Sequence, residues 1–271
     1  TAAAQAIEND EAMTVDDRLT SLYPQIVLAR LQAASAPAAT AVVTATGATT
    51  ATAAGEAAEG EPTEVPLPAE LVARVADRVA WATATVTDKD EMQTVMGTMV
   101  WVLQETGQDA AAEQLLIDKL DTTLEPYYYM TNLGKMAEDR DDTAGALKWY
   151  RQAWQTAEGS MTRFRWGHSY LRALLRLTPD DEATIEADAT AILTELMAKS
   201  DALALGNGDR MATLSTALLG WNEDGAHDAV VARLRDLVAA KCADLDATGD
   251  DSQQSRCQRF LAPPDEAGSE G

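Results

Sequence analysis

Helical periodicity runs through the chain from Leu67 almost to its end, and no stretch in this region alternates polar and apolar residues as a strand would. Alanine supplies 52 of the 271 residues, whereas aromatic residues supply only 5%. Side chains this small favour closely packed helices over sheets. The sequence therefore predicts an all-α fold.

The connections between the apolar-periodic segments carry helix start and stop signals. Asp142 stands where a helix should begin and Gly107 where one should end. Near the N-terminus, Thr14 and Asp17 form a capping-box pattern, and Pro24 predicts a kink or restart of the helix. We predict helices at 14–32, 69–86, 89–105, 109–122, 126–139, 143–157, 161–177, 181–199, 209–221, 224–245 and 254–261.

Composition divides the chain into four parts. Residues 1–32 are predicted to be a helical segment that packs on the main domain, and 67–262 to be that domain. Between them, 33–66 are nearly all Ala, Thr, Gly and Glu, too few large apolar side chains to offset the entropy of ordering, which predicts a flexible insertion. Residues 263–271 read as a disordered acidic tail.

A repeat of the tetratricopeptide type, with a period of about 34 residues, is visible at 127–160 and again at 93–126. Small residues let two helices approach closely, and aromatic residues fill the groove between pairs. The positions that carry the pattern are Met99–Val100, Ala112, Leu115–Leu116, Leu120, Leu133–Gly134, Ala146, Trp149–Tyr150 and Ala153. We therefore expect tetratricopeptide-like antiparallel helical pairs that form a short right-handed solenoid.

The charge of the chain excludes two classes of partner. Its 44 acidic and 21 basic side chains give a formal net charge of −23. A surface this acidic repels phosphate backbones and anionic lipid, so we expect no nucleic-acid binding. No apolar stretch approaches the roughly 18 to 20 residues that span a bilayer, so we expect no membrane insertion.

Motifs of catalytic or metal chemistry are missing from the sequence. No nucleophile elbow, S-x-x-K, C-x-x-C or H-E-x-x-H is present. Residues 244–255 resemble a calcium loop, but Ser255 occupies the position that requires a bidentate glutamate. His168 has no second ligand one helical turn away and reads as a packed or hydrogen-bonded side chain. We expect no catalytic residue, no metal and no cofactor.

The two cysteines, Cys242 and Cys257, lie 15 residues apart. The favoured interpretation is a disulfide, worth about 3 kcal/mol for a loop of this size; two reduced thiols are the alternative. A disulfide would indicate an oxidising compartment.

A surface for a protein or peptide partner remains. In tetratricopeptide-like pairs the first helix of each pair lines the concave face, and the repeat register assigns eight side chains to it. These candidate partner-binding residues are Trp101, Gln104, Tyr128, Thr131, Lys135, Arg165, Ser169 and Arg172. A basic and aromatic patch on an acidic protein suits an extended or acidic segment. The alternative is that these are ordinary solvated side chains.

Several stretches have a more particular likeness: Pro126–Met130, Gly145–Tyr150, Met161–Gly167, Leu175–Pro179 and Cys257–Leu261. Together they resemble the C-terminal helical region of proteobacterial thioredoxin-family proteins, over residues 14–32 and 69–261. The resemblance implies a helical, partner-binding or substrate-binding region beside a redox domain in the periplasm. The thioredoxin domain with its C-x-x-C is not among these 271 residues, so its dithiol chemistry does not transfer.

The sequence thus predicts a non-catalytic, periplasmic protein-interaction module. Two alternatives stay open: a thiol/disulfide redox protein that uses Cys242 and Cys257, and a structural subunit of a larger assembly. The partner and the oligomeric state are not predicted.

Overall fold

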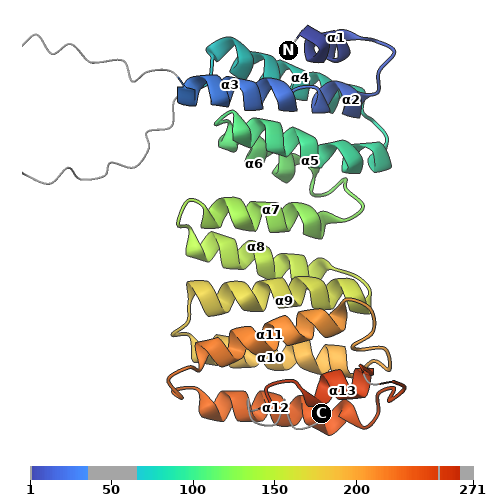
Figure 1. Ribbon diagram of the computed structural model, residues 1–271, viewed down its shortest axis with the longest axis vertical. Coiled ribbons are helices and arrows are strands. Elements are labelled where there is room, and N and C mark those ends of the chain that lie inside the picture. The colour runs from blue at the N-terminus through green and yellow to red at the C-terminus, as the bar shows by residue number, and fades with distance from the viewer. Residues whose placement is uncertain (1, 36–65, 250, 263–271) are drawn as a thin grey trace, which may run out of the picture. The chain divides into compact units, whose positions relative to one another are not determined.

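The computed structural model describes residues 2–35, 66–249 and 251–262, and within them every regular element is an α-helix (Figure 1). The all-α prediction is confirmed. The chain divides into two compact units, Thr1–Leu115 and Leu116–Gly271. The predicted domain at 67–262 therefore contains parts of both units. None of the described helices combines the length and apolar character that a membrane span needs.

The helices of the first unit are α1 (Ala2–Asn9), α2 (Val15–Thr20), α3 (Tyr23–Ser35), α4 (Ala69–Thr85) and α5 (Lys89–Glu105), and the division between units falls within α6 (Asp109–Lys119). The second unit continues with α7 (Pro126–Glu138), α8 (Thr143–Thr156), α9 (Ser160–Leu177), α10 (Glu182–Met197), α11 (Asn207–Trp221), α12 (Asp228–Cys242) and α13 (Gln253–Gln258).

The restart predicted at Pro24 is confirmed: the segment 14–32 is two helices, and the second begins at Tyr23. Two other details differ from the prediction. Helix α1 was not predicted. Helix α3 continues through Ser35, so residues 33–35 of the predicted insertion are helical. The rest of that insertion up to residue 65, and the predicted tail 263–271, lie outside the described residues.

In the first unit, a buried carboxylate holds α1 in place. Glu8 is 1% exposed and forms ion pairs with Arg74 and Arg78 of α4. It also accepts a hydrogen bond from the Gln25 amide of α3 at 3.0 Å. Its backbone carbonyl accepts a further bond from Arg18 of α2. One glutamate thus ties together four helices, because a buried charge is tolerated only when it is paired and hydrogen-bonded.

In the second unit, α7, α8 and α9 pack in succession (Figure 1). Gly134 makes the close approach of α7 and α8 possible, since a Cβ at this position would lie 2.7 Å from the ring of Tyr150. Gly167 likewise allows α9 and α10 to approach closely, since a Cβ at this position would lie 3.0 Å from Ile192. The expectation that small residues let paired helices approach is met at Gly134 and Tyr150.

Two polar triads, each of a carboxylate, a tyrosine and an arginine, link successive helices. Glu138 of α7 accepts hydrogen bonds from Tyr150 of α8 and from Arg176 of α9. The second triad lies one helix further along the chain: buried Asp188 of α10 accepts from Tyr170 of α9 at 2.8 Å and from Arg151 of α8 at 3.1 Å.

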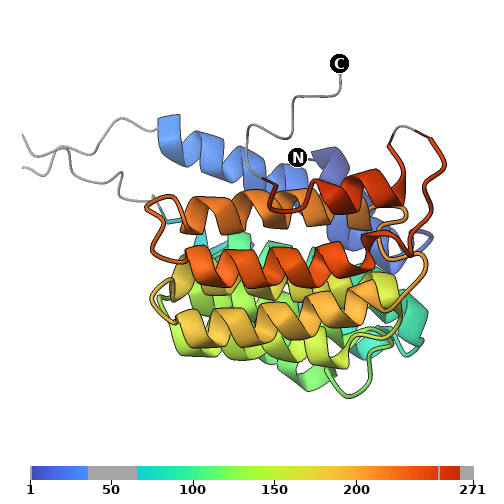
Figure 2. The same ribbon diagram turned by 90° about the horizontal axis from the view of Figure 1, so that it is seen from below.

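From α9 onward the helices form two layers. Helix α9 packs against α10 and α11, and α10 packs against α12 (Figure 2). Helices α9 and α11 run parallel. His168 of α9 is near Arg210 of α11. At the C-terminal ends of both helices, the carbonyl of Pro179 accepts a hydrogen bond from the indole of Trp221. Helices α10 and α12 are parallel too, as Glu182–His227 and Glu186–Arg233 show.

A disulfide between Cys242 and Cys257 closes the C-terminal end, with the two Cα atoms 5.5 Å apart. It fastens α13 to α12, and Phe260 and Leu261 beyond it are buried in the core. The backbone N–H of Leu261 donates to the Ser215 hydroxyl of α11 at 2.9 Å. The predicted disulfide is confirmed, and the reduced-thiol alternative does not apply to this structure.

Candidate functional site

Helices α7 and α9 place six of the predicted partner-binding residues along one stretch of the second unit. Side chains of the two helices meet at two points: Arg165 donates to the Tyr128 hydroxyl at 3.2 Å, and Arg176 donates to Glu138. The residue numbers increase together from the first contact to the second, so the helices are parallel. We call the six predicted residues on these two helices the α7–α9 face: Tyr128, Thr131, Lys135, Arg165, Ser169 and Arg172.

One end of the α7–α9 face is aromatic. The guanidinium of Arg165 lies 5.3 Å from the ring centre of Tyr128 and 4.8 Å from that of Trp166. The two rings meet edge to face, 5.1 Å apart. Buried Trp166 has no hydrogen-bond partner for its indole nitrogen among the described residues. Stacking on two rings holds the Arg165 cation in place without neutralising it.

The middle of the face is less available to a partner than the sequence suggested. The hydroxyls of Thr131 and Ser169 donate to carbonyls one turn earlier in their own helices. Lys135 pairs with Asp139 at 2.8 Å, and both side chains are exposed. Thr131 and Ser169 therefore contribute shape rather than free donors, and the charge of Lys135 is largely compensated by its own helix.

The remaining cation of the face, Arg172, is different. Of the arginines in the described part of the chain, only Arg172 and Arg210 have no hydrogen bond, ion pair or ring contact with any described residue. Arg172 is exposed on α9, and Arg210 lies half-buried in the first turns of α11. Two cations without acidic partners are unexpected in a chain with 44 acidic side chains.

His168 is close enough to Arg172 and Arg210 for their charges to act on its imidazole ring. It is 8% exposed, and its Nε2 atom has no hydrogen-bond partner among the described residues. Burial, together with the positive charges of Arg172 and Arg210, lowers the pKa of His168 to about 4. The prediction that His168 is packed holds, because its ring lies beside Phe164. No hydrogen bond to the ring satisfies Nε2, however.

Two of the predicted residues belong to the first unit. Trp101 of α5 lies against the ring of Tyr23 in α3, with centroids 4.1 Å apart, and is half-buried there. Gln104 follows one turn later on the same helix. That Trp101 and Gln104 share a face with α7 and α9 stays a prediction.

The acidic loop before α13 uses its carboxylates internally. Asp246 accepts from both the backbone and the hydroxyl of Thr248, which lowers the pKa of Asp246. Asp251 binds Arg256 and Arg259, and these two arginines lower its pKa. The Asp246 contacts lie within the loop, and the contact of Asp251 with Arg256 fastens the loop to α13.

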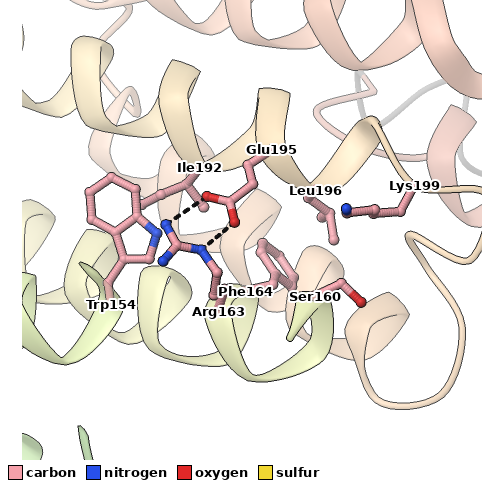
Figure 3. A pocket seen from close by; sticks show the side chains of 8 residues that line it. All are labelled: Trp154, Ser160, Arg163, Phe164, Ile192, Glu195, Leu196 and Lys199. Atoms are coloured by element: carbon pink, nitrogen blue, oxygen red, sulfur yellow. Dashed lines mark hydrogen bonds and ion pairs between the residues drawn. The ribbon is translucent and has the colours of Figure 1, made fainter. Parts of the chain in front are cut away.

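The pocket between α8, α9 and α10 is too small for a ligand. Figure 3 shows it around the ion pair of Arg163 and Glu195, with Trp154 and Phe164 beside the pair. Its volume is about 10 Å³, which is room for one water molecule at most. Arg163 also donates to the last carbonyls of α8, at Gln155 and Ala157, so this pair is part of the packing.

Sequence reasoning missed Trp166, His168 and Arg210 as members of the site. The repeat register loses step after the turn at Thr178 and Pro179, so it could not place α11 beside α9. The only signal for Arg210 was its position in the first turn of the helix that begins after Gly206.

No protein family model, curated protein or solved structure matches this chain. The resemblance to the helical region of thioredoxin-family proteins therefore stays a prediction, as does the periplasmic location that it implies.

Proposed function

We propose that this chain is a non-catalytic protein-interaction module that binds an extended, acidic polypeptide along α7, α9 and α11. The observation that carries the proposal is the pair of arginines without acidic partners, Arg172 and Arg210, on neighbouring parallel helices of a protein with a net charge of −23. Arg165, Tyr128 and Trp166 extend the same surface with an aromatic end.

The helix arrangement supports a tetratricopeptide-like form of this module. Helix α7 lies parallel to α9, α9 to α11, and α10 to α12. In stacked helical pairs, the first helices lie beside one another and the second helices do the same, which leaves one continuous face for a partner. We propose that α7 and α9 are the first helices of two such pairs in a right-handed solenoid, and that α11 extends the row of first helices beside α9.

The charges also set the strength and selectivity of binding. An exposed arginine–carboxylate pair contributes about 0.2 to 1 kcal/mol, and a desolvated one at the centre of an interface about 2 kcal/mol or more. A few such pairs give moderate affinity. The acidic surface elsewhere repels an acidic partner, so an acidic segment is directed to this face. The disulfide supports an exported, periplasmic location, because such bonds persist in oxidising compartments.

A charge-reversal comparison tests the proposal. Arg165→Glu/Arg172→Glu and the control Lys199→Glu/Lys241→Glu change the net charge equally, and both control lysines are exposed. Fluorescence anisotropy would follow a labelled, capped peptide of alternating Glu and Ala. We expect the arginine variant to bind at least tenfold more weakly and the lysine control within about twofold of wild type. Equal losses in both variants, or no binding to wild type by any member of an acidic peptide set, would overturn it.

A further inference from the structure

We infer that Arg172, Arg210 and His168 form a subsite that binds the carboxylate of an aspartate or glutamate side chain in the bound polypeptide. This inference rests on the proposed function and names the chemistry that the partner must offer. We call these three residues the carboxylate subsite.

His168 provides the first reason. Its side chain is more than nine-tenths buried, yet Nε2 is without a hydrogen bond in the described structure. A buried polar atom left in this state costs about 1 to 3 kcal/mol. A packed apolar residue at the same place would avoid that cost. A ligand oxygen that accepts a hydrogen bond from Nε2 would remove it.

The charges around His168 provide the second reason. Arg172 lies one turn further along α9, and Arg210 approaches from α11, which packs against α9. Both charges act on the imidazole in the same direction, and no carboxylate offsets them. The field at the buried nitrogen is therefore positive and uncompensated, which favours an anion beside it.

The start of α11 provides the third reason. The Arg210 guanidinium lies close to Gly206, where an added Cβ would come within 2.9 Å of Nη1. Gly206 thus leaves room for this head group against the first turn of α11. The amino end of a fifteen-residue helix carries a partial positive charge. The helix end and Arg210 therefore act together on an anion at this position.

A carboxylate suits this donor set. Guanidinium groups bind planar carboxylates through two parallel hydrogen bonds, and an imidazole N–H supplies a third donor. Aspartate and glutamate carry this group in an acidic polypeptide. Phosphate offers similar oxygens, so the experiment includes inorganic phosphate as a competitor.

The first measurement is binding of the alternating Glu/Ala peptide and of its Gln/Ala counterpart. We expect the Glu peptide to bind about tenfold more weakly to Arg172→Gln and to Arg210→Gln. We also expect His168→Leu to weaken it about fivefold, whereas His168→Gln, which keeps a donor, stays within about twofold. Lys199→Gln is the control. Unchanged binding in the arginine variants would overturn the subsite while leaving the wider binding face intact, and so would an equal affinity for the Gln peptide.

The second measurement is independent of polypeptide binding. Imidazole ¹⁵N resonances of the full chain report the titration of His168, and the His227→Gln variant assigns them, because the chain has only two histidines. We expect saturating glutarate to raise the pKa of His168 and millimolar phosphate to have a smaller effect. No change with glutarate, or a larger change with phosphate, would overturn the carboxylate assignment. A shift with glutarate but no polypeptide binding would overturn the proposed function and keep the subsite.

Discussion

Helix α9 carries four arginines, and the two near its ends differ from the two between them. Arg163 binds Glu195 through two hydrogen bonds, and Arg176 binds Glu138 through three. Arg165 and Arg172 contact no carboxylate of the described chain. Since acidic residues outnumber basic ones two to one, scarcity of acids does not explain the difference. Arginines at the ends fasten neighbouring helices, and those in the middle are left for a partner.

This contrast predicts that packing and binding can be broken separately. Removing a paired charge should lower the free energy of unfolding and leave peptide affinity unchanged in the folded protein. Removing a cation that has no acidic partner should weaken peptide binding and leave the free energy of unfolding unchanged.

The largest effect is expected for Asp188→Ala. Asp188 is buried and accepts from Tyr170 and Arg151, so its removal leaves two groups without their acceptor. We expect the free energy of unfolding of the second unit to fall by about 4 kcal/mol. Urea unfolding followed by tryptophan fluorescence measures this change. Asp188→Asn, which retains an acceptor oxygen, should lose less. An Asp188→Ala variant as stable as wild type would show that this triad does not fasten the helices.

The C-terminal disulfide should affect stability but not binding. Cys242→Ser/Cys257→Ser removes a crosslink across a 15-residue separation, and we expect a loss of about 3 kcal/mol. The α7–α9 face is made by other helices, so peptide affinity should stay within twofold. Paired urea-unfolding and anisotropy measurements check both expectations. A large loss of affinity in a variant that is still folded would mean that peptide binding at the α7–α9 face requires this disulfide.

His168 should make stability depend on pH. Its pKa is about 4 in the folded protein, against an ordinary value of 6.5. Below pH 6.5 the unfolded chain takes up a proton that the folded protein does not accept until about pH 4. Stability should therefore fall as pH falls through this window. The loss is worth roughly 3 kcal/mol, at about 1.4 kcal/mol for each pH step.

Urea unfolding of wild type and His168→Gln at pH 7 and pH 4.5 isolates that contribution, because the carboxylates titrate in both proteins. The variant should lose less stability than wild type between the two pH values. Parallel losses in the two proteins would show that His168 is not held neutral.

The parts that could be predicted from the sequence are the local ones. Thr14 and Asp17 form the capping box that their spacing indicates, because its atoms lie within one turn. Helix α1 was missed because Glu8, which holds it, depends on Arg74 and Arg78 far along the chain. Short alanine-rich helices gain most of their stability from such packing and little from propensity.

The candidate site also has a part that could be predicted from the sequence and a part that could not. The contact of Tyr128 with Arg165 could be foreseen, since a fixed repeat places both on first helices. The group of His168, Arg172 and Arg210 could not, because it needs α11 to lie beside α9. No local pattern reports that contact. Lys135 was overvalued for the opposite reason: its partner Asp139 is on its own helix and was visible in the sequence.

The smallest stability effect gives the sharpest comparison. Arg172 and Arg176 are exposed residues one turn apart on α9, one without an acidic partner and the other bound to Glu138. Arg172→Gln and Arg176→Gln remove the same charge from nearly the same place. The decisive measurement is the peptide dissociation constant and the free energy of unfolding of both variants, taken side by side.

We expect Arg172→Gln to bind the Glu peptide about tenfold more weakly with stability within about 0.5 kcal/mol of wild type. We expect Arg176→Gln to bind as wild type does and to lose about 1 kcal/mol of stability. Equal binding by the two variants, whether both retain it or both lose it, would contradict the division of α9 into packing and binding arginines.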